Sequence, residues 1–506
     1  MKKHSFLPIT GALSLLVTAI PFTGTAQNAL QRATDDLQVR SEAVVTASPG
    51  TTPFYLSANR YGLSGTDGGY GYLRGGLFRA AEADSAHRWR IGYGIDVAAA
   101  YDMTSSFVVQ QLYADFDWRA IRLTVGSKER PSELKNALLS TGGLTASMNA
   151  RPVPQVRLGL PEFWNIPGTH GWLAIKGHVA YGRFTDDSWQ EDFHAPGEHY
   201  AKGVYYHSKA GFLRIGNKEK FPLTFTGGLE MYAQFGGEAW NIGYRADGNS
   251  SGFTGDYVNM NDGLKGFWNA FIPGGSDERD GDFANVAGNQ LGSWHLSLDY
   301  HGRGWGIRGY AEHYFEDHSQ MFLEYGWKDM LWGAEIQLPK NPFVSTVLYE
   351  HLRTTDQTGS VYHDATPQLP YQISGADNYY NHQCYGAWQH WGQVMGNPLL
   401  VSPIYNTDGT IAVKHNRITA HHFGIAGRPT DEIDYRVLLT HVRSLGSYTE
   451  PVIDPVHANY WMAEAGYAPR WAKGFALRAA VASNGGDLLG KSTGALISLR
   501  WNGNFR

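Results

Sequence analysis

The last residues of the chain alternate between apolar and polar side chains. The apolar phase contains Ala495, Ile497, Leu499, Trp501 and Phe505, and the polar phase contains Gly494, Ser498, Arg500, Asn502 and Asn504. Because successive side chains of a β-strand point to opposite faces, one face of this strand suits lipid and the other suits water. Repeated along an exported chain, this pattern predicts an all-β protein, a transmembrane antiparallel β-barrel.

Similar alternation recurs between turn signals from residue 54 onward. The best-defined segments span about 9–12 residues, which is the length a tilted strand needs to cross a bilayer, whereas soluble β-proteins average about five or six. We predict eighteen strands, an even number as bacterial single-chain barrels require: residues 54–61, 72–80, 88–100, 107–118, 120–127, 172–184, 201–214, 223–235, 291–302, 305–316, 319–327, 331–338, 343–354, 416–428, 433–443, 459–468, 474–484 and 493–505.

The direction of the last strand assigns a side to every connection, because both ends of such a barrel lie in the periplasm. Short turns at residues 429–432 and 469–473 then fall inside, and the long segments 128–171, 355–415 and 444–458 fall outside. The same parity puts residues 236–290 on the periplasmic side. Tyr257 to Phe271 could form a short periplasmic helix there, and the segment could cap or plug the barrel; otherwise one of the short strands is wrong.

The start of the chain predicts export. Lys2, Lys3 and His4 precede an apolar stretch from Leu7 to Ile20 that is too short for a membrane span, and Gly24-Thr25-Ala26 offers small residues for cleavage. Residues 1–26 are therefore expected to be a signal peptide. Residues 27–50 are predicted to be a periplasmic segment, with a short helix over Ala29 to Arg40, and residues 51–506 to be the barrel.

Composition narrows the class of protein further. Glycine accounts for 61 of 506 residues and aromatic residues for 13%, which suits a barrel with aromatic girdles. No stretch after residue 26 holds some 18 apolar residues, which excludes a helical membrane protein. A net charge of −5 with mixed signs gives no reason to expect nucleic acid. Cys384 is the only cysteine, so there is no disulfide framework.

Residues 377–399 are the most distinctive stretch, rich in aromatic and amide side chains. Flat rings can stack on the apolar faces of sugars, and amides can both donate to and accept from hydroxyls. Parity places this stretch outside, so it predicts a glycan-binding loop. The alternative is that its aromatics pack the loop on itself or on the barrel rim. The candidate glycan-binding residues are Tyr379, Tyr380, Asn381, Tyr385, Trp388, His390, Trp391 and Asn397.

Two runs carry a resemblance to a known family. The first run spans residues 138–152 and contains Leu-Ser-Thr-Gly-Gly-Leu at 139–144 and Asn-Ala-Arg-Pro at 149–152. The second run spans residues 379–399 and is followed by Ser402-Pro403-Ile404-Tyr405-Asn406. In these runs, and in its length and strand rhythm, the chain resembles the Wzi capsule-assembly family of outer-membrane proteins, in the form found in Bacteroidetes. Arg506 after Phe505 departs from the terminal aromatic common among outer-membrane barrels.

The resemblance implies an eighteen-stranded barrel sealed by periplasmic helices, in the outer membrane of a Gram-negative bacterium. It also implies lectin-like attachment of capsular or exopolysaccharide at the cell surface, with no catalytic residues. Expected partners are that polysaccharide, outer-membrane lipid and capsule-export machinery, and the barrel is expected to work as a monomer without a cofactor.

Other functions have weaker support in the sequence. His421 and His422 would point to opposite faces of a strand, Glu312 and His318 lie far apart along one, and no EF-hand spacing occurs, so we predict no metal site. No G-x-S-x-G elbow occurs, so we predict no enzyme. A porin or oligosaccharide channel remains the alternative. Its support is an inward charged row, which also suits a lumen crossed by ion pairs: Arg90, Asp96, Asp115, Asp117, Asp299, Arg478 and Arg500.

Overall fold

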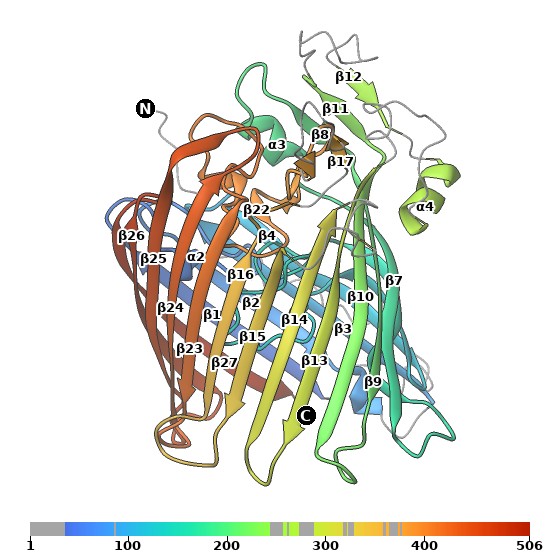
Figure 1. The fold of residues 1–506 in the computed structure, drawn as a ribbon. Helices are drawn as coiled ribbons and strands as arrows, with labels where there is room; N and C mark the ends of the chain where they lie inside the picture. The colour runs from blue at the N-terminus through green and yellow to red at the C-terminus, as the bar shows by residue number, and fades with distance from the viewer. Residues whose placement is uncertain are drawn as a thin grey trace, which may run out of the picture.

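Eighteen antiparallel strands form one closed sheet in the computed structural model of the chain (Figure 1). The structure describes residues 36–84, 88–242, 257–260, 263–272, 288–316, 321, 328–357, 361–363, 373–374 and 377–505. The sheet closes where β1 pairs with β27 on one side, through Ser41 opposite Trp501, and with β2 on the other. The predicted fold class is therefore confirmed, whereas the predicted signal peptide lies outside the described residues.

The barrel strands follow one another around the wall in chain order. They are β1 (Leu37–Ala47), β2 (Gly71–Arg79), β3 (Trp89–Tyr101), β4 (Phe107–Trp118), β5 (Ile121–Ser127), β6 (Gln155–Asn165), β7 (Leu173–Arg183), β9 (Tyr205–Ile215), β10 (Leu223–Phe235), β13 (Asn289–His301), β14 (Gly306–Glu316), β15 (Met330–Gln337), β16 (Thr346–Arg353), β23 (Ile418–Gly427), β24 (Ile433–Gly446), β25 (Pro451–Tyr467), β26 (Phe475–Gly486) and β27 (Ser492–Phe505).

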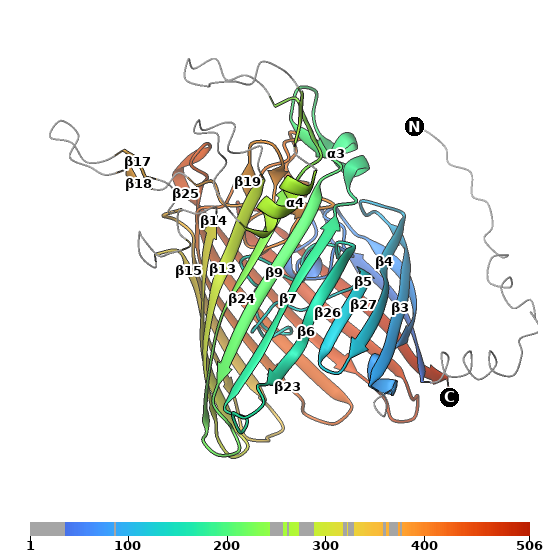
Figure 2. The ribbon, with the colours of Figure 1, turned by 90° about the vertical axis from the view of Figure 1, so that its right-hand side faces the viewer.

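The two ends of the barrel differ in their connections (Figures 1 and 2). At the turn end, where β27 finishes, strands are joined by short segments such as 302–305 and 428–432. At the loop end they are joined by long segments, including 128–154 and 354–417. Among the described residues, no helix is long and apolar enough to cross a membrane.

The alternation of the last strand is observed as predicted. Ile497 is 58% exposed on the outer face, whereas Ser498 is 7% exposed on the inner face. Arg500 also points inward and pairs with Glu42 of β1 at 3.0 Å. The outer face thus carries apolar side chains and the inner face carries polar ones, which is the pattern that lipid and a hydrated interior require.

The start of the barrel corrects three predictions. Residues 37–47 form β1 rather than part of a periplasmic segment and helix, because Glu42 and its neighbours pair with β27 in register. Residues 54–61 are not a strand: Phe54–Ser57 form the helical turn α2 inside the barrel, where Phe54 stacks on Tyr460 at 4.6 Å. The apolar run there serves the interior instead of lipid.

The strand β6 was missed because its sequence reads as a loop. It contains Gly159 and Pro161, and its pairing with β7 shifts register between Leu160 and Trp164, which is where a strand tolerates proline. The predicted strand 319–327 lies outside the described residues apart from Met321. The strands that flank it, β14 and β15, pair directly with each other.

In the barrel sheet, nine strands (β13 to β16 and β23 to β27) follow residues 236–290, where ten were predicted, and this difference reverses the predicted side of that segment. Since β10 ends and β13 begins at the loop end, this segment lies there and not at the turn end. Its helix, α4 (Leu264–Phe271), packs beside β9 and β10 near the loop end, with Phe267 against Tyr205 and Phe235. In the described part of the chain, the turn end holds only the single 3₁₀ turn η1 (Ala81–Asp84), so the expected helical seal is absent from those residues.

Three loop-end segments fold back into the barrel and fill its lumen. We call residues 48–70, 128–154 and 377–413 the lumen plug. Many of its apolar side chains belong to one buried cluster with inward side chains of the wall, including Leu56, Leu144 and Trp388 from the plug and Tyr232 and Leu352 from the wall. These segments therefore occupy the lumen, whereas the helix α4 of residues 236–290 packs beside β9 and β10 near the loop end.

Two wall carboxylates hold the middle segment of the plug. Glu350 of β16 accepts hydrogen bonds from Ser140 Oγ at 2.6 Å and from the Thr141 amide and hydroxyl at 2.8 Å each. Glu312 of β14 accepts from the Leu144 amide at 2.7 Å and pairs with Lys135 Nζ at 2.8 Å. Hydrogen bonds to buried charged groups contribute about 1.5–3 kcal/mol each, so these contacts fix the segment strongly.

The inward charged row is paired, as one of the two sequence interpretations required. The ion pairs are Arg90–Asp117 at 3.1 Å, Arg74–Asp96 at 2.5 Å, Lys128–Asp115 at 2.5 Å, Arg308–Asp299 at 2.5 Å, Arg478–Glu464 at 2.7 Å and Arg500–Glu42 at 3.0 Å.

Replacing Glu350 should release the middle segment of the plug. The substitution Glu350→Ala removes the acceptor of three plug hydrogen bonds and is expected to cost about 3 kcal/mol or more. Denaturant unfolding in lipid vesicles measures that loss, and limited proteolysis should reveal new cleavage within residues 134–150. Glu219→Ala, in an exposed turn, is the control. Wild-type stability and protease resistance in the Glu350 variant would contradict this account of the plug.

Candidate carbohydrate-binding surface

Most of the predicted glycan-binding residues lie in the core of the plug. Tyr379, Tyr380, Trp388 and Asn397 have no exposed surface, and Tyr385 and His390 are 1% exposed. Stacking on a sugar needs an open ring face, and these rings have none in this structure. Six of the eight residues thus pack as the alternative interpretation expected, and only Asn381 and Trp391 keep partial exposure.

Trp388 shows how the stretch is held together. Its indole Nε1 donates to the Thr145 carbonyl at 2.9 Å, and its ring stacks on Tyr206 of the wall. Tyr380 links the same segments, since its hydroxyl donates to the Leu144 carbonyl and accepts from the Asn397 amide. Gly396 is needed for this packing, because a Cβ there would lie 2.0 Å from the Tyr380 hydroxyl.

The remaining predicted residues sit at the outer edge of the plug. Asn381 Nδ2 donates to the Val413 carbonyl at 3.0 Å, and the guanidinium of Arg151 lies 4.4 Å from the centre of the Trp391 ring. Burial lowers the pKa of neighbouring His382 to about 3, so this histidine is uncharged at neutral pH. Trp391 is therefore the one aromatic of the eight that could still contact a ligand.

A small sheet at the loop end offers a better surface. The strands β8 (Tyr200–Lys202), β11 (Glu238–Trp240) and β12 (Tyr257–Asn259) pair in the order β12-β11-β8 above the barrel wall (Figure 1). The central residues Ala201 and Ala239 have no exposed surface and face the interior. The flanking side chains of each strand therefore share the opposite, outer face.

We call this outer side of the sheet the aromatic face. In register across it lie Tyr200, Trp240 and Tyr257, and beside them lies a polar row of Lys202, Glu238 and Asn259. The Tyr200 and Trp240 rings are nearly parallel, at an interplanar angle of 10°, and Tyr257, 43% exposed, meets Trp240 at 4.6 Å. Flat rings beside hydrogen-bonding groups are the combination that sugar recognition uses.

The helix α3 (Asp187–Phe193) supports β8 from the side. Its Gln190 side chain accepts from the Ala201 amide at 3.0 Å, and Asp187 accepts from the Gly203 amide at 3.0 Å. Lys202 pairs with Glu191 of the same helix, and that hydrogen bond raises the pKa of Lys202, so its charge is kept. The aromatic face is thus a supported element and not a free loop.

Sequence reasoning missed the aromatic face. Its three strands are each three residues long, and they come from two loops far apart in the chain. The sequence signal is that each strand has a small or apolar residue between one aromatic and one polar residue. The three strands read Tyr-Ala-Lys, Glu-Ala-Trp and Tyr-Val-Asn. Three-residue alternation is too short to identify a strand without knowing its partner.

One buried cluster has residue types that bind metals. Ligand atoms of Glu230, His295 and Glu312 lie within 4.8 Å of one another. His295 Nε2 contacts Glu230 at 3.0 Å, and the Lys135 ammonium lies 2.8 Å from Glu312. A lysine ammonium on one carboxylate is the arrangement of an ion-pair network, so this cluster serves to fix the plug to the wall.

Comparisons with known proteins point to the same fold. No protein-family model matches the chain, and no curated protein matches it in sequence. Among solved structures, the chain resembles Wzi, an outer-membrane protein involved in group 1 capsule assembly in Escherichia coli and described as a carbohydrate-binding β-barrel. The TM-score is 0.56 at 11% identity, covering 94% of this chain and 86% of Wzi.

Two further solved structures match with lower TM-scores. OccAB2 of Acinetobacter baumannii gives a TM-score of 0.45 at 9% identity, over 93% of this chain and 98% of that one. OccK2 of Pseudomonas aeruginosa, solved with glucuronate, gives 0.46 at 7% identity over 93% and 98%. The likeness to Wzi, at a TM-score of 0.56 and 11% identity, shows a shared fold: this chain is an eighteen-stranded β-barrel resembling Gram-negative outer-membrane proteins.

Proposed function

We propose that the chain is a non-enzymatic outer-membrane barrel that binds capsular or other surface polysaccharide at its loop end, as a member of the Wzi type. The observation that carries the proposal is the aromatic face, where Tyr200, Trp240 and Tyr257 lie in one row beside Lys202, Glu238 and Asn259. A polymer of sugars can bind such a row through many weak contacts. Trp391 and Asn381 at the edge of the plug extend the proposed site.

The orientation of the barrel supports a role at the cell surface. Long loops face outward in outer-membrane barrels, and short turns face the periplasm. The aromatic face lies at the end with the long loops. In this proposal the barrel acts as a monomer in outer-membrane lipid, and capsule-export machinery delivers the polysaccharide.

A porin function has less support from the described interior. The lumen plug buries large side chains such as Trp388 and Tyr380 across the barrel, and many of the wall charges are paired with one another or with the plug. A plugged lumen suits a binding protein better than a general channel.

Removing the aromatic row should weaken glycan binding without unfolding the barrel. The double variant Tyr200→Ala/Trp240→Ala is expected to lower the affinity for the organism's purified surface polysaccharide at least tenfold, because two stacking rings are lost. Surface plasmon resonance measures the affinity, and cell-associated capsule is the cellular readout. Trp471→Ala removes an exposed tryptophan at the turn end and serves as the control. Equal affinity in the double variant and the control would refute the proposed site.

The plugged lumen predicts electrical silence. Purified wild-type protein in planar bilayers should show no steady conductance at 1 M salt, because the plug fills the lumen. A variant lacking residues 379–399 should show open-channel steps, which proves that the assay detects inserted barrels. Steady wild-type conductance of the same size as the deletion variant's would favour the porin alternative.

A further inference from the structure

A small cavity lies inside the barrel, between the plug segment that starts at Lys128 and the wall strands β6, β9 and β10. Its volume is about 90 Å³, and its lining includes Arg130, Arg157, Arg151, Tyr206 and Tyr232. This is the smallest of the three cavities described below, and it has room for a small polar ligand.

Three arginines line this cavity, and the two that also line the neighbouring cavity, Arg130 and Arg157, have only neutral partners among the described residues. Arg157 Nη2 lies 2.9 Å from His178 Nδ1, and Arg130 Nη1 donates to the Lys128 carbonyl at 3.1 Å. Because a guanidinium can only donate, His178 Nδ1 must accept and the ring is therefore neutral. Within the described chain, no carboxylate oxygen lies within 4 Å of either guanidinium.

The acidic side chains near these two arginines contact other partners. Glu133, which also lines the cavity, pairs with Lys176 at 2.7 Å, and Glu230 contacts His295 at 3.0 Å. Asp115 pairs with Lys128 at 2.5 Å. Burial, together with the charge of Arg157, lowers the pKa of Arg130 to about 10, which reflects the same lack of a counter-charge. Both arginines are partly buried, and a charge that is partly removed from water gains from an opposite charge beside it.

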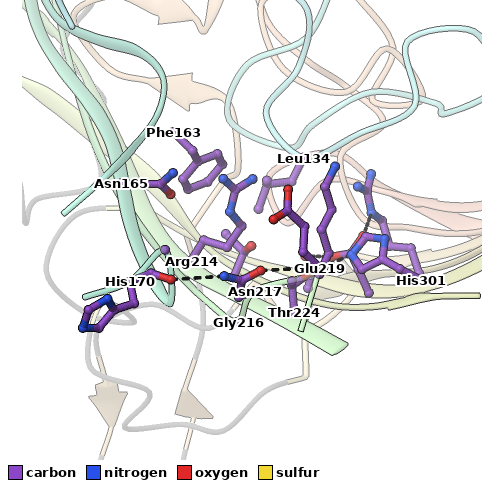
Figure 3. A pocket seen from close by; sticks show the side chains of 16 residues that line it. Leu134, Phe163, Asn165, His170, Arg214, Gly216, Asn217, Glu219, Thr224 and His301 are labelled. Carbon is purple, nitrogen blue, oxygen red and sulfur yellow. Dashed lines mark hydrogen bonds and ion pairs between the residues drawn. The ribbon is translucent and has the colours of Figure 1, made fainter. Parts of the chain in front are cut away.

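Two further cavities share lining residues in series from this cavity toward the turn end. A larger cavity of about 430 Å³ on the other side of residues 130–133 also has Arg130 and Arg157 in its lining. It shares Leu134 and Phe163 with a third cavity, of about 460 Å³, that is lined by turn-end residues such as Asn217 and His170 (Figure 3). There Arg214 lies 4.2 Å from the centre of the Phe163 ring.

We infer that Arg130 and Arg157 form a binding site for a small oxyanion, a carboxylate or phosphate group, that enters the lumen from the turn end. The planar forks of two guanidinium groups match such anions through paired hydrogen bonds. A free phosphate ion and the acidic group of a sugar share this chemistry. The inference rests on the interior of the barrel and is independent of the aromatic face.

Calorimetric titration of the full-length protein in detergent micelles tests this inference. Inorganic phosphate represents the free ion, sodium glucuronate represents a sugar acid, and methyl glucoside is the neutral control. We expect saturable binding of at least one anion and none of methyl glucoside. Binding of glucuronate alone would identify a sugar carboxylate as the ligand, and binding of phosphate alone would identify a free ion. Failure of both anions to bind at millimolar concentration would overturn the proposal.

Matched variants locate the site. Arg130→Gln and Arg157→Gln should each weaken anion binding at least tenfold, whereas Arg214→Gln, at the turn-end cavity, should not. Without anion, the first two variants should melt at or above the wild-type temperature, because each loses an unpaired buried charge; with anion, only wild type and Arg214→Gln should be stabilised. Loss of binding in Arg214→Gln alone, or a melting temperature well below wild type in both Arg130 and Arg157 variants without anion, would overturn the assignment.

Discussion

The structure depends on how the polar inner wall of a wide barrel finds hydrogen-bond partners. Alternation puts carboxylates such as Glu312 and Glu350 inside, where burial without partners would be costly. Backbone amides and hydroxyls of the plug supply those partners at Ser140, Thr141 and Leu144. The wall carboxylates therefore hold the plug in place, and the plug supplies the hydrogen-bond donors that these carboxylates need.

This mutual dependence explains why some aromatic residues at the loop end are buried and others are exposed. The aromatic residues of 377–399 are used to build a packed interior, with Trp388 between Thr145 and Tyr206. Surface left for a ligand lies above that interior, on the small sheet carried by α3. A rigid plug gives this sheet a fixed base, since Ala201 and Ala239 pack into the same buried cluster as the plug.

Many charges of the lumen follow the same rule. Arg74 has an opposite partner in Asp96, and Arg500 has one in Glu42. Arg130 and Arg157 differ because the acids near them are held by Lys176, His295 and Lys128. Two neighbouring cations without a carboxylate partner are a place where a ligand can supply the opposite charge.

The sequence by itself determined the barrel, because side-chain alternation is a local property that β27 displays within its own residues. It could not identify β1, whose role depends on pairing with the far end of the chain, nor β6, where Pro161 hides a bulged strand. Burial of Tyr379 and Trp388 was equally out of reach, since an aromatic residue suits a sugar or a core alike. Only the tertiary structure decided between these uses, because it brings Trp388 to Thr145 and Glu350 to Thr141 across more than two hundred residues of sequence.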